Sequence, residues 1–300
     1  QYKEVLSNKP SPQETQAAVT GLEEIYMNDL GKPDEYLAIL EKLPNYKAND
    51  YSADSLHFKV GEVRFLNGEY EKAIESFTTY IQKFPKGYYK SNAFYFRAES
   101  RAVLKKYAEA LDDYAFVLLD SGSSYYESAL KKAAIITFNH TQDFKQSFLY
   151  YDKYFQISKV ESEKLWAANG AIRSAFKNND KNGVQNYGEK ILSMNSADQE
   201  DKALASYFTG KMLYNEKQLD QALTCFQKIG NDINLSQAAE ARFWIGDILI
   251  KQNKWEEAEI HCNNSNEVNK YYPYWIARTV LLLSDIYVHK KDLYLSLIHI

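Results

Sequence analysis

The chain has 300 residues, 45% of them hydrophobic and 25% charged, with a formal net charge of −4 and an isoelectric point near 5.8. This slightly acidic balance argues against a nucleic-acid-binding protein, which normally carries a basic field. Only 6 Pro and 12 Gly accompany 25 Tyr, which favours packed helices over strands, because strands would need more turn residues.

The first residues resemble the end of a helical pair. The sequence does not begin with methionine, and Tyr2 stands as far from Pro10 as Phe77 stands from Pro85. We therefore expect the chain to open in the second helix of a repeat whose first helix is missing. A further helix is expected to begin at Pro33, because the missing N–H of proline costs nothing in a first helical turn.

Residues 54–90 show the clearest pattern. Gly61, Ala73, Phe77 and Pro85 follow one another at offsets of 12, 4 and 8 residues. We expect the two small residues to lie where two antiparallel helices meet backbone to backbone, a place that a large side chain would force open. Aromatic residues are expected to fill the groove between one hairpin and the next, and these are Phe77, Tyr114, Tyr151 and Phe226.

The second small residue of this pattern recurs along the chain at steps of 37, 37, 36, 39 and 36 residues, at Ala73, Ala110, Ser147, Gly183, Ala222 and Ala258. Ordering one unit costs about 1–2 kcal/mol per residue in backbone entropy, more than one hairpin can offset, so neighbouring units must stack. We expect one continuous array over 1–300, with a partial repeat at 1–11, full repeats at about 12–43, 54–90, 91–124, 125–160, 161–196, 197–235 and 236–271, and an incomplete repeat at 272–300.

The set of small, aromatic, Ala, aromatic and Pro positions resembles the tetratricopeptide repeat. The resemblance implies an all-α fold, a right-handed superhelical solenoid of about seven to eight helical hairpins. The Trp expected before the first small residue is found only at Trp166, and His57 or Phe94 replaces it elsewhere. The units exceed the usual length of about 34 residues. Such long units resemble those of bacterial cell-envelope scaffolds, which implies a periplasmic or envelope location, with a cytoplasmic one as the alternative.

Two segments depart from the repeat pattern. Residues 43–53 form a longer irregular connector, which we interpret as a bend between two parts of the array. Residues 295–300 read Leu-Ser-Leu-Ile-His-Ile, which is also the translation of a transposase end sequence used in sequencing libraries. We expect these six residues to derive from an untrimmed adapter, so that the sequence is a fragment.

The sequence offers no pattern that favours catalysis. It contains no GxSxG, Walker-type or GxGxxG motif, and its five histidines do not stand at zinc-ligand spacing. We expect Cys225 and Cys262 to be small buried hydrophobic residues rather than metal ligands or a disulfide. The stretch from Tyr274 to Val288 is interrupted by charges and is read as a buried helix. We therefore expect no enzyme activity, no cofactor, no metal and no insertion into a membrane.

The resemblance also implies a binding surface. In the family, first helices line a concave face, and residues three before and one after the first small residue point into it. These positions and the aromatic residues one turn further along are Phe58, Glu62, Phe65, Tyr95, Glu99, Tyr207, Lys211, Tyr214, Phe243 and Asp247. An aromatic residue followed by a charged one would give rigid contacts beside polar specificity groups. The alternative is that these aromatic side chains pack against the preceding hairpin.

The leading hypothesis is a non-catalytic scaffold that binds extended segments of a protein or peptide partner on this face, and not nucleic acid. One alternative is a cytoplasmic adaptor that senses a signalling peptide. The other is the non-catalytic arm of a larger envelope hydrolase. The sequence does not identify the partner.

Overall fold

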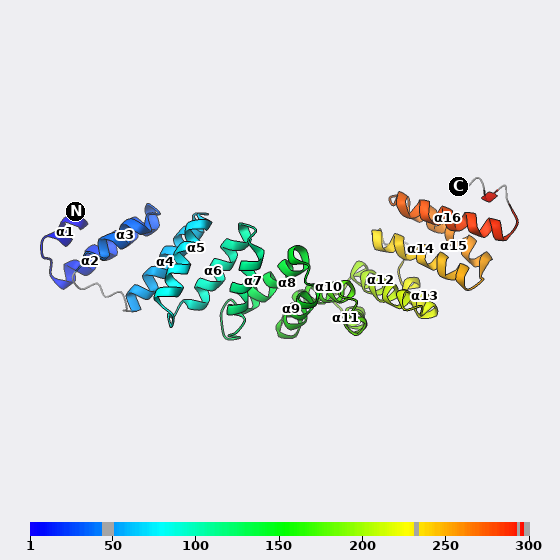
Figure 1. The fold of residues 1–300 in the computed structure, drawn as a ribbon, viewed down its shortest axis with the longest axis horizontal. Helices are drawn as coiled ribbons and strands as arrows, with labels where there is room; N and C mark the ends of the chain where they lie inside the picture. The colour runs from blue at the N-terminus through cyan, green and yellow to red at the C-terminus, as the bar shows by residue number, and fades with distance from the viewer. Residues whose placement is uncertain (44–50, 231–233, 293–294, 297–300) are drawn as a thin grey trace. The chain divides into compact units, whose positions relative to one another are not determined.

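The computed structural model describes residues 1–43, 51–230, 234–292 and 295–296. In these residues all regular structure is helical, with sixteen α-helices and two π-helical segments. Figure 1 labels the α-helices along the chain. The prediction of an all-α chain is confirmed. The chain divides into two compact units, Gln1–Thr141 and Gln142–Ile300, and each is a series of packed antiparallel hairpins.

The first unit begins with short helices and continues with two regular hairpins, in which α4 packs on α5 and α6 packs on α7. Its helices are α1 (Tyr2–Ser7), α2 (Pro12–Glu23), η1 (Glu24–Asp29), α3 (Pro33–Leu40), α4 (Tyr51–Leu66), α5 (Tyr70–Lys83), α6 (Lys90–Val103), α7 (Tyr107–Val117), α8 (Tyr126–Ile136) and η2 (Thr137–Thr141). The helix predicted to begin at Pro33 does so. The predicted bend at 43–53 falls mainly on residues 44–50, which lie outside the described residues.

The second unit contains the pairs α10–α11, α12–α13 and α14–α15. Its helices are α9 (Phe144–Ile157), α10 (Glu161–Lys177), α11 (Lys181–Ser193), α12 (Gln199–Asn215), α13 (Leu219–Gln227), α14 (Ser236–Lys251), α15 (Trp255–Val268) and α16 (Pro273–His289). The boundary between the units lies inside the repeat predicted at 125–160. Of the predicted adapter, residues 297–300 lie outside the described residues, while the Ser296 hydroxyl lies 3.1 Å from that of Ser284.

The turn between the two helices of a hairpin repeats along the chain. A residue with left-handed backbone stands two positions before each second helix, for example Gly68 at φ 75° and Lys217 at φ 63°. At Lys217 the backbone N–H donates to Tyr214 O (2.9 Å), and the N–H of Gln218 donates to Leu213 O (2.9 Å). This pair of bonds is a Schellman motif, which satisfies the last carbonyl groups of the first helix. The same pair of bonds forms at Gly68, Lys105, Asn179, Asn253 and Lys291, so the motif ends these first helices and sets the direction of the chain that follows.

Small residues allow the two helices of a hairpin to approach. Ala73, Ala110, Ala222 and Ala258 are fully buried, as the repeat spacing predicted. The contact at the first small residue differs from the expected backbone-to-backbone approach, because an aromatic ring lies there. A Cβ atom on Gly210 would stand 2.7 Å from Cε1 of Phe226. The small residue thus makes room for a ring of its own hairpin.

A buried ion cluster joins the two helices of the α6–α7 hairpin. The side chain of Asp113 is 2% exposed and accepts hydrogen bonds from Arg97 Nη2 (2.7 Å) and Arg101 Nη1 (2.6 Å). Arg97 also donates to the hydroxyl of Thr78 (3.0 Å) on α5. One carboxylate therefore holds two cations from the neighbouring helix and connects this hairpin to the preceding one.

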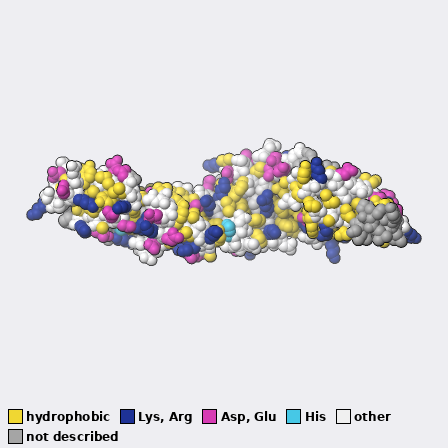
Figure 2. Space-filling view, turned by 90° about the horizontal axis from the view of Figure 1, so that it is seen from above, with side chains coloured by type: hydrophobic (Ala, Val, Ile, Leu, Met, Phe, Trp, Pro, Cys, Tyr) yellow, Lys and Arg dark blue, Asp and Glu magenta, His cyan; other side chains and the backbone are white. Residues whose placement is uncertain are grey.

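Charged side chains of both signs are interspersed on the face of the molecule seen in Figure 2, in keeping with the formal net charge of −4. None of the described helices is both long enough and apolar enough to cross a membrane.

Candidate functional site

The predicted binding residues lie on first helices, α4 and α6 in the first unit and α12 and α14 in the second. Three of the aromatic side chains are nearly buried: Phe58 is 6% exposed, Tyr207 7% and Phe243 3%. Tyr95 is half-buried. These side chains leave little surface for a ligand, and what covers them is the beginning of the following first helix.

In the first unit the covering residues are tyrosines that immediately precede a first helix. The ring of Phe58 stacks on Tyr89 at 4.8 Å between centroids, and Tyr95 stacks on Tyr125 at 4.3 Å. Burial, together with the charge of Glu99, raises the pKa of Tyr95 to about 12. The aromatic position thus joins each repeat to the following one, whereas the packing alternative had placed these rings against the preceding hairpin.

The second unit has the same arrangement with other residue types. Phe243 lies 5.6 Å from the ring of Trp275, close to the start of α16. Tyr207 hydrogen-bonds to Glu240 on α14, and burial followed by the Glu240 charge raises the pKa of Tyr207. The predicted aromatic residues therefore form the contact between successive first helices in both units.

The charged candidates of the first unit are more accessible. Glu99 on α6 accepts hydrogen bonds from the hydroxyl of Tyr114 and from Lys132 Nζ (2.9 Å), which belongs to α8. Glu62 on α4 lies close enough to Tyr125 for its charge to raise the pKa of that phenol, in addition to the larger effect of burial. Phe65 is half-buried and lies edge-on to Phe96 at 5.1 Å. Glu99 is thus held in part by a lysine of the neighbouring repeat.

In the second unit Lys211 lies between two residues of α14. Its Nζ donates to Glu240 Oε1 (2.9 Å) and stands 3.6 Å from the centre of the Trp244 ring. The indole Nε1 of Trp244 donates to the same carboxylate oxygen (2.9 Å). Burial raises the pKa of Glu240, but the hydrogen bonds from Trp244 and Lys211 outweigh it, and the net pKa is lowered. This carboxylate is therefore held ionised between its donors.

A second polar contact lies on the same two helices. The hydroxyl of Tyr214 donates to Asp247 Oδ2 (2.6 Å), and Lys251 Nζ donates both to that oxygen (2.7 Å) and to the phenol. The Tyr214 ring lies 4.5 Å from Trp244. Lys211, Tyr214, Trp244 and Asp247 together form an accessible aromatic and charged surface, called here the α12–α14 surface.

Sequence reasoning missed Glu240, Trp244, Lys251 and Lys132. All four lie on first helices, but their roles depend on pairing between different repeats. The charge of Lys211 and the opposite charge of Glu240, 29 residues later, give a signal only once the register of neighbouring helices is known. The repeat pattern identified the face but not the pairs on it.

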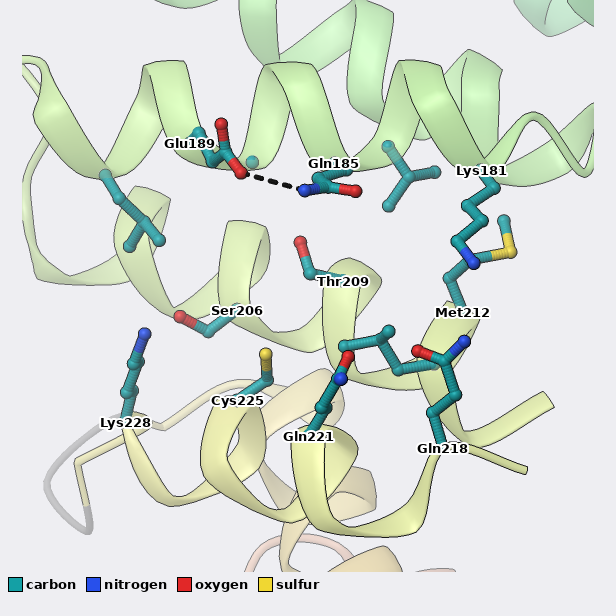
Figure 3. A pocket seen from close by; sticks show the side chains of 14 residues that line it. Lys181, Gln185, Glu189, Ser206, Thr209, Met212, Gln218, Gln221, Cys225 and Lys228 are labelled. Atoms are coloured by element: carbon teal, nitrogen blue, oxygen red, sulfur yellow. Dashed lines mark hydrogen bonds between the residues drawn. The ribbon is translucent and has the colours of Figure 1, made fainter. Parts of the chain in front are cut away.

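A pocket was also missed. It lies in the second unit between α11, α12 and α13, and Figure 3 shows the side chains that line it. Cys225 is among them and is only half-buried, so the expectation that both cysteines are buried holds for Cys262 alone. Burial raises the pKa of the Cys262 thiol to about 12.

In the part of the chain that the structure describes, no three His, Cys, Asp or Glu side chains lie together in an arrangement suited to a metal ion. His57 contacts the ring of Phe84 at 5.4 Å and Lys83 Nζ at 3.1 Å. His261 faces the backbone oxygen of Arg242 (2.8 Å), whereas the neighbouring Cys262 faces Gly246. The adjacent His and Cys side chains thus point toward different partners.

Comparison with known proteins agrees with the helical hairpins. The family model of the tetratricopeptide repeat matches residues 54–87, which include α5 and most of α4. Comparison with curated proteins gives no match.

Several solved structures are similar. The C-terminal part of a TPR repeat-containing protein from Cytophaga hutchinsonii is 16% identical, over 81% of this chain and 92% of that one, with a TM-score of 0.56. The apo form of RapI is 13% identical, over 96% and 93% of the two chains, with a TM-score of 0.50. A tetratricopeptide repeat protein from Parabacteroides merdae, 13% identical over 89% and 99%, has a TM-score of 0.43. Residues 54–87 are therefore a tetratricopeptide repeat, and the chain has the fold of such proteins.

Proposed function

We propose that this chain is a non-catalytic scaffold that binds an extended segment of a partner protein along the faces of its first helices. The observation that carries the proposal is the α12–α14 surface, where half-buried aromatic rings stand next to fixed charges. Binding energy at protein interfaces is concentrated on such aromatic and cationic residues at desolvated positions.

The side chains of the α12–α14 surface are held in place by contacts within the chain itself. Trp244 is held by its hydrogen bond to Glu240 and by Lys211 above its ring, and Tyr214 by its bond to Asp247. A rigid ring loses little side-chain entropy on binding, so more of the contact energy is available for affinity. This supports a role in recognition over a role in packing alone.

The paired charges on the first helices favour a partner segment that carries both acidic and basic residues. Lys211 and Glu240 lie side by side, as do Lys251 and Asp247, and Glu99 with Lys132 repeats the pattern in the first unit. A segment of one sign would meet repulsion at every second position, whereas alternating charges would be accommodated. We expect an extended peptide with both acidic and basic residues around an apolar one.

The test is selection of random linear peptides displayed on phage against the whole chain, followed by fluorescence anisotropy with the recovered peptides. Trp244→Ala and Lys211→Met should each weaken binding by about tenfold, since an interface hot spot contributes more than about 1 kcal/mol. Lys153→Met is the matched control, because Lys153 is exposed on the second helix α9. Circular dichroism confirms that each variant is folded.

Two results would contradict a binding role for the first helices. One is that the peptides bind Lys211→Met and Trp244→Ala as tightly as they bind the unaltered chain. The other is that Lys153→Met, and not these two variants, weakens peptide binding. The scaffold proposal as a whole would be contradicted if no selected peptide binds the chain specifically, so that the same peptide without a label, free in solution, fails to displace it.

A further inference from the structure

The pocket of the second unit lies between the second helices α11 and α13, with the first helix α12 beneath them (Figure 3). Its volume is about 320 Å³, at the lower end of the range for ligand pockets. The side chains of Val184, Leu192, Met212 and Leu213 give it mainly apolar walls. It faces away from the surface proposed above, which is formed by first helices.

The floor of this pocket carries hydroxyl groups. Ser206 on α12 is 3% exposed, and its side chain lines the pocket. The Oγ1 atom of Thr209 is buried, and the described residues provide no hydrogen-bond partner for it. It lies against Gly188, where a Cβ atom would stand only 2.5 Å away. A buried polar group that lacks a partner is costly, so a ligand that hydrogen-bonds to the Thr209 hydroxyl would gain affinity.

The next repeat shows how the equivalent groove can be used for structure instead. A shift of 36 residues takes Gly210 to Gly246, and it takes Ser206 to Arg242 and Cys225 to His261. Arg242 Nη1 donates to Asn269 Oδ1 (2.8 Å), and the His261 ring bonds to the Arg242 backbone oxygen (2.8 Å). In that groove long polar side chains bind one another. A cavity of about 320 Å³ remains beside them and is lined by Arg242, His261 and Glu257. In the α11–α13 groove the equivalent cavity is lined by short side chains such as Ser206 and Cys225.

The mouth of the pocket is electrically balanced and rich in amides. Lys181 is paired with Glu216 at 2.6 Å, and Glu189 accepts a hydrogen bond from Gln185 (3.1 Å). Gln185, Gln218 and Gln221 surround the opening, and Figure 3 shows them on α11 and α13. A primary amide both donates and accepts, as a peptide bond does. This mouth therefore suits a peptide main chain better than an ion.

We propose that the pocket binds one neutral side chain of a partner segment, apolar along its length and ending in a hydrogen-bonding group, as tyrosine does. The apolar walls contact the ring, the phenol meets the hydroxyls of Ser206 and Thr209, and the glutamines hydrogen-bond to the adjoining main chain. The proposal shares with the proposed function only that the partner is a protein segment. It concerns the second helices α11 and α13 and other residues of α12, and it is tested without Lys211 and Trp244.

The half-buried Cys225 thiol on the pocket wall allows a direct test, because the other cysteine, Cys262, is fully buried. The whole chain is equilibrated with cysteamine disulfides that carry N-acetylated tyrosine, phenylalanine, glutamate or lysine, in the presence of 2-mercaptoethanol. The Cys225 thiolate attacks the disulfide, one S–S bond forms as another breaks, and a cysteamine thiol leaves. Mass spectrometry then measures the fraction of chain that retains each group.

We expect the tyrosine group to be retained about fivefold more strongly than the phenylalanine group, the effect of one hydrogen bond, and more strongly still than the charged groups. Cys225→Ser should abolish labelling. Ser206→Leu, which fills the pocket, should remove the preference for tyrosine. Gln221→Ala, at an exposed position, should lower tyrosine retention without unfolding the chain.

Equal retention of the four groups would overturn the proposal, as would a preference for a charged group or a preference for tyrosine that persists in Ser206→Leu. If circular dichroism shows Ser206→Leu to be unfolded, the test uses Gln221→Ala and Gln185→Ala instead. Unchanged retention of the tyrosine group in both of these variants would overturn the proposal. None of these results depends on whether Trp244 and Lys211 bind a peptide.

Discussion

Gly61 and Phe77 lie so close inside one hairpin that a Cβ atom on Gly61 would stand 2.5 Å from Cε1 of the ring. Gly210 and Phe226 repeat the relationship at the same offset of 16 residues. At the same offset from Gly246 stands Cys262 in place of the aromatic residue. Its sulfur atom would lie 2.8 Å from a Cβ atom on Gly246. At Gly61 and Gly210 the first small residue is therefore required by the ring of the second helix, whereas at Gly170 the ring is that of Tyr151 on the preceding helix α9.

This relationship predicts the effect of Gly61→Ala. Alanine favours a helix over glycine by about 1 kcal/mol, but overpacking a fitted contact costs about 1–3 kcal/mol, so the variant should be less stable in urea unfolding. In a Phe77→Leu background the ring is absent, and the same change should be neutral or stabilising. Equal destabilisation in both backgrounds would show that the ring is not the cause.

The left-handed turn predicts a stabilising substitution. Lys217 has φ 63°, a conformation that costs an L-residue about 1–2 kcal/mol and glycine almost nothing. Glycine also adds about 0.4–1 kcal/mol of chain entropy to the unfolded state, so Lys217→Gly should stabilise by about 0.5–1 kcal/mol. Lys153→Gly, inside helix α9, should instead destabilise by about 1 kcal/mol. A lower urea midpoint for Lys217→Gly would contradict this account of the turn.

The buried ion cluster predicts a large loss of stability. Asp113→Ala removes the carboxylate that holds Arg97 and Arg101, whose side chains are 11% and 17% exposed. Breaking a buried ion pair from one side costs about 3–5 kcal/mol. Asp112→Ala, at the exposed neighbouring position, should change the free energy of unfolding by less than about 0.5 kcal/mol. Similar values for the two variants would rule out a structural role for the cluster.

His261 predicts a dependence of stability on pH. Burial lowers the pKa of its imidazole below 6.5, an effect that the hydrogen bond to the Arg242 backbone only partly offsets. The folded chain therefore favours the neutral ring, and its contribution is present above pH 6.5 and decreases as the pH falls toward the folded-state pKa. The free energy of unfolding, measured in urea between neutral pH and about pH 5, should fall less steeply in His261→Gln. An identical slope in the variant would assign the pH dependence to other groups.

Much of the fold could be predicted from the sequence because the hairpin is a local structure. The spacing that joins Gly61, Ala73 and Phe77 depends only on how two consecutive helices meet. Ala73 is buried as the spacing indicated, whereas the ring of Phe77 lies against Gly61, where contact between the two backbones was expected. The turn at Lys217 could not be predicted in the same way, because lysine gives no sign of left-handed backbone. Its hydrogen bonds to the end of α12 impose that conformation.

The site was less predictable because it depends on contacts between repeats. Phe58 and Phe243 carry the signature of binding residues within their own hairpins, but Tyr89 and Trp275 from the following repeats cover them. The lining of the pocket depends on Ser206 and Cys225, because Arg242 and His261 stand at these positions in the next repeat and line a cavity of similar volume there. A single sequence does not show which residues of neighbouring helices lie side by side, so this difference between the two repeats could not be predicted from it.

The stacking of Phe58 on Tyr89 and of Tyr95 on Tyr125 has a consequence for the history of the gene. The two joints lie one repeat apart and pair the same kinds of rings, so an unequal crossover between adjacent copies would place a suitable tyrosine under either aromatic residue. Gain or loss of a whole repeat therefore leaves a working joint, and the length of the array can change by single steps while its neighbours keep their contacts.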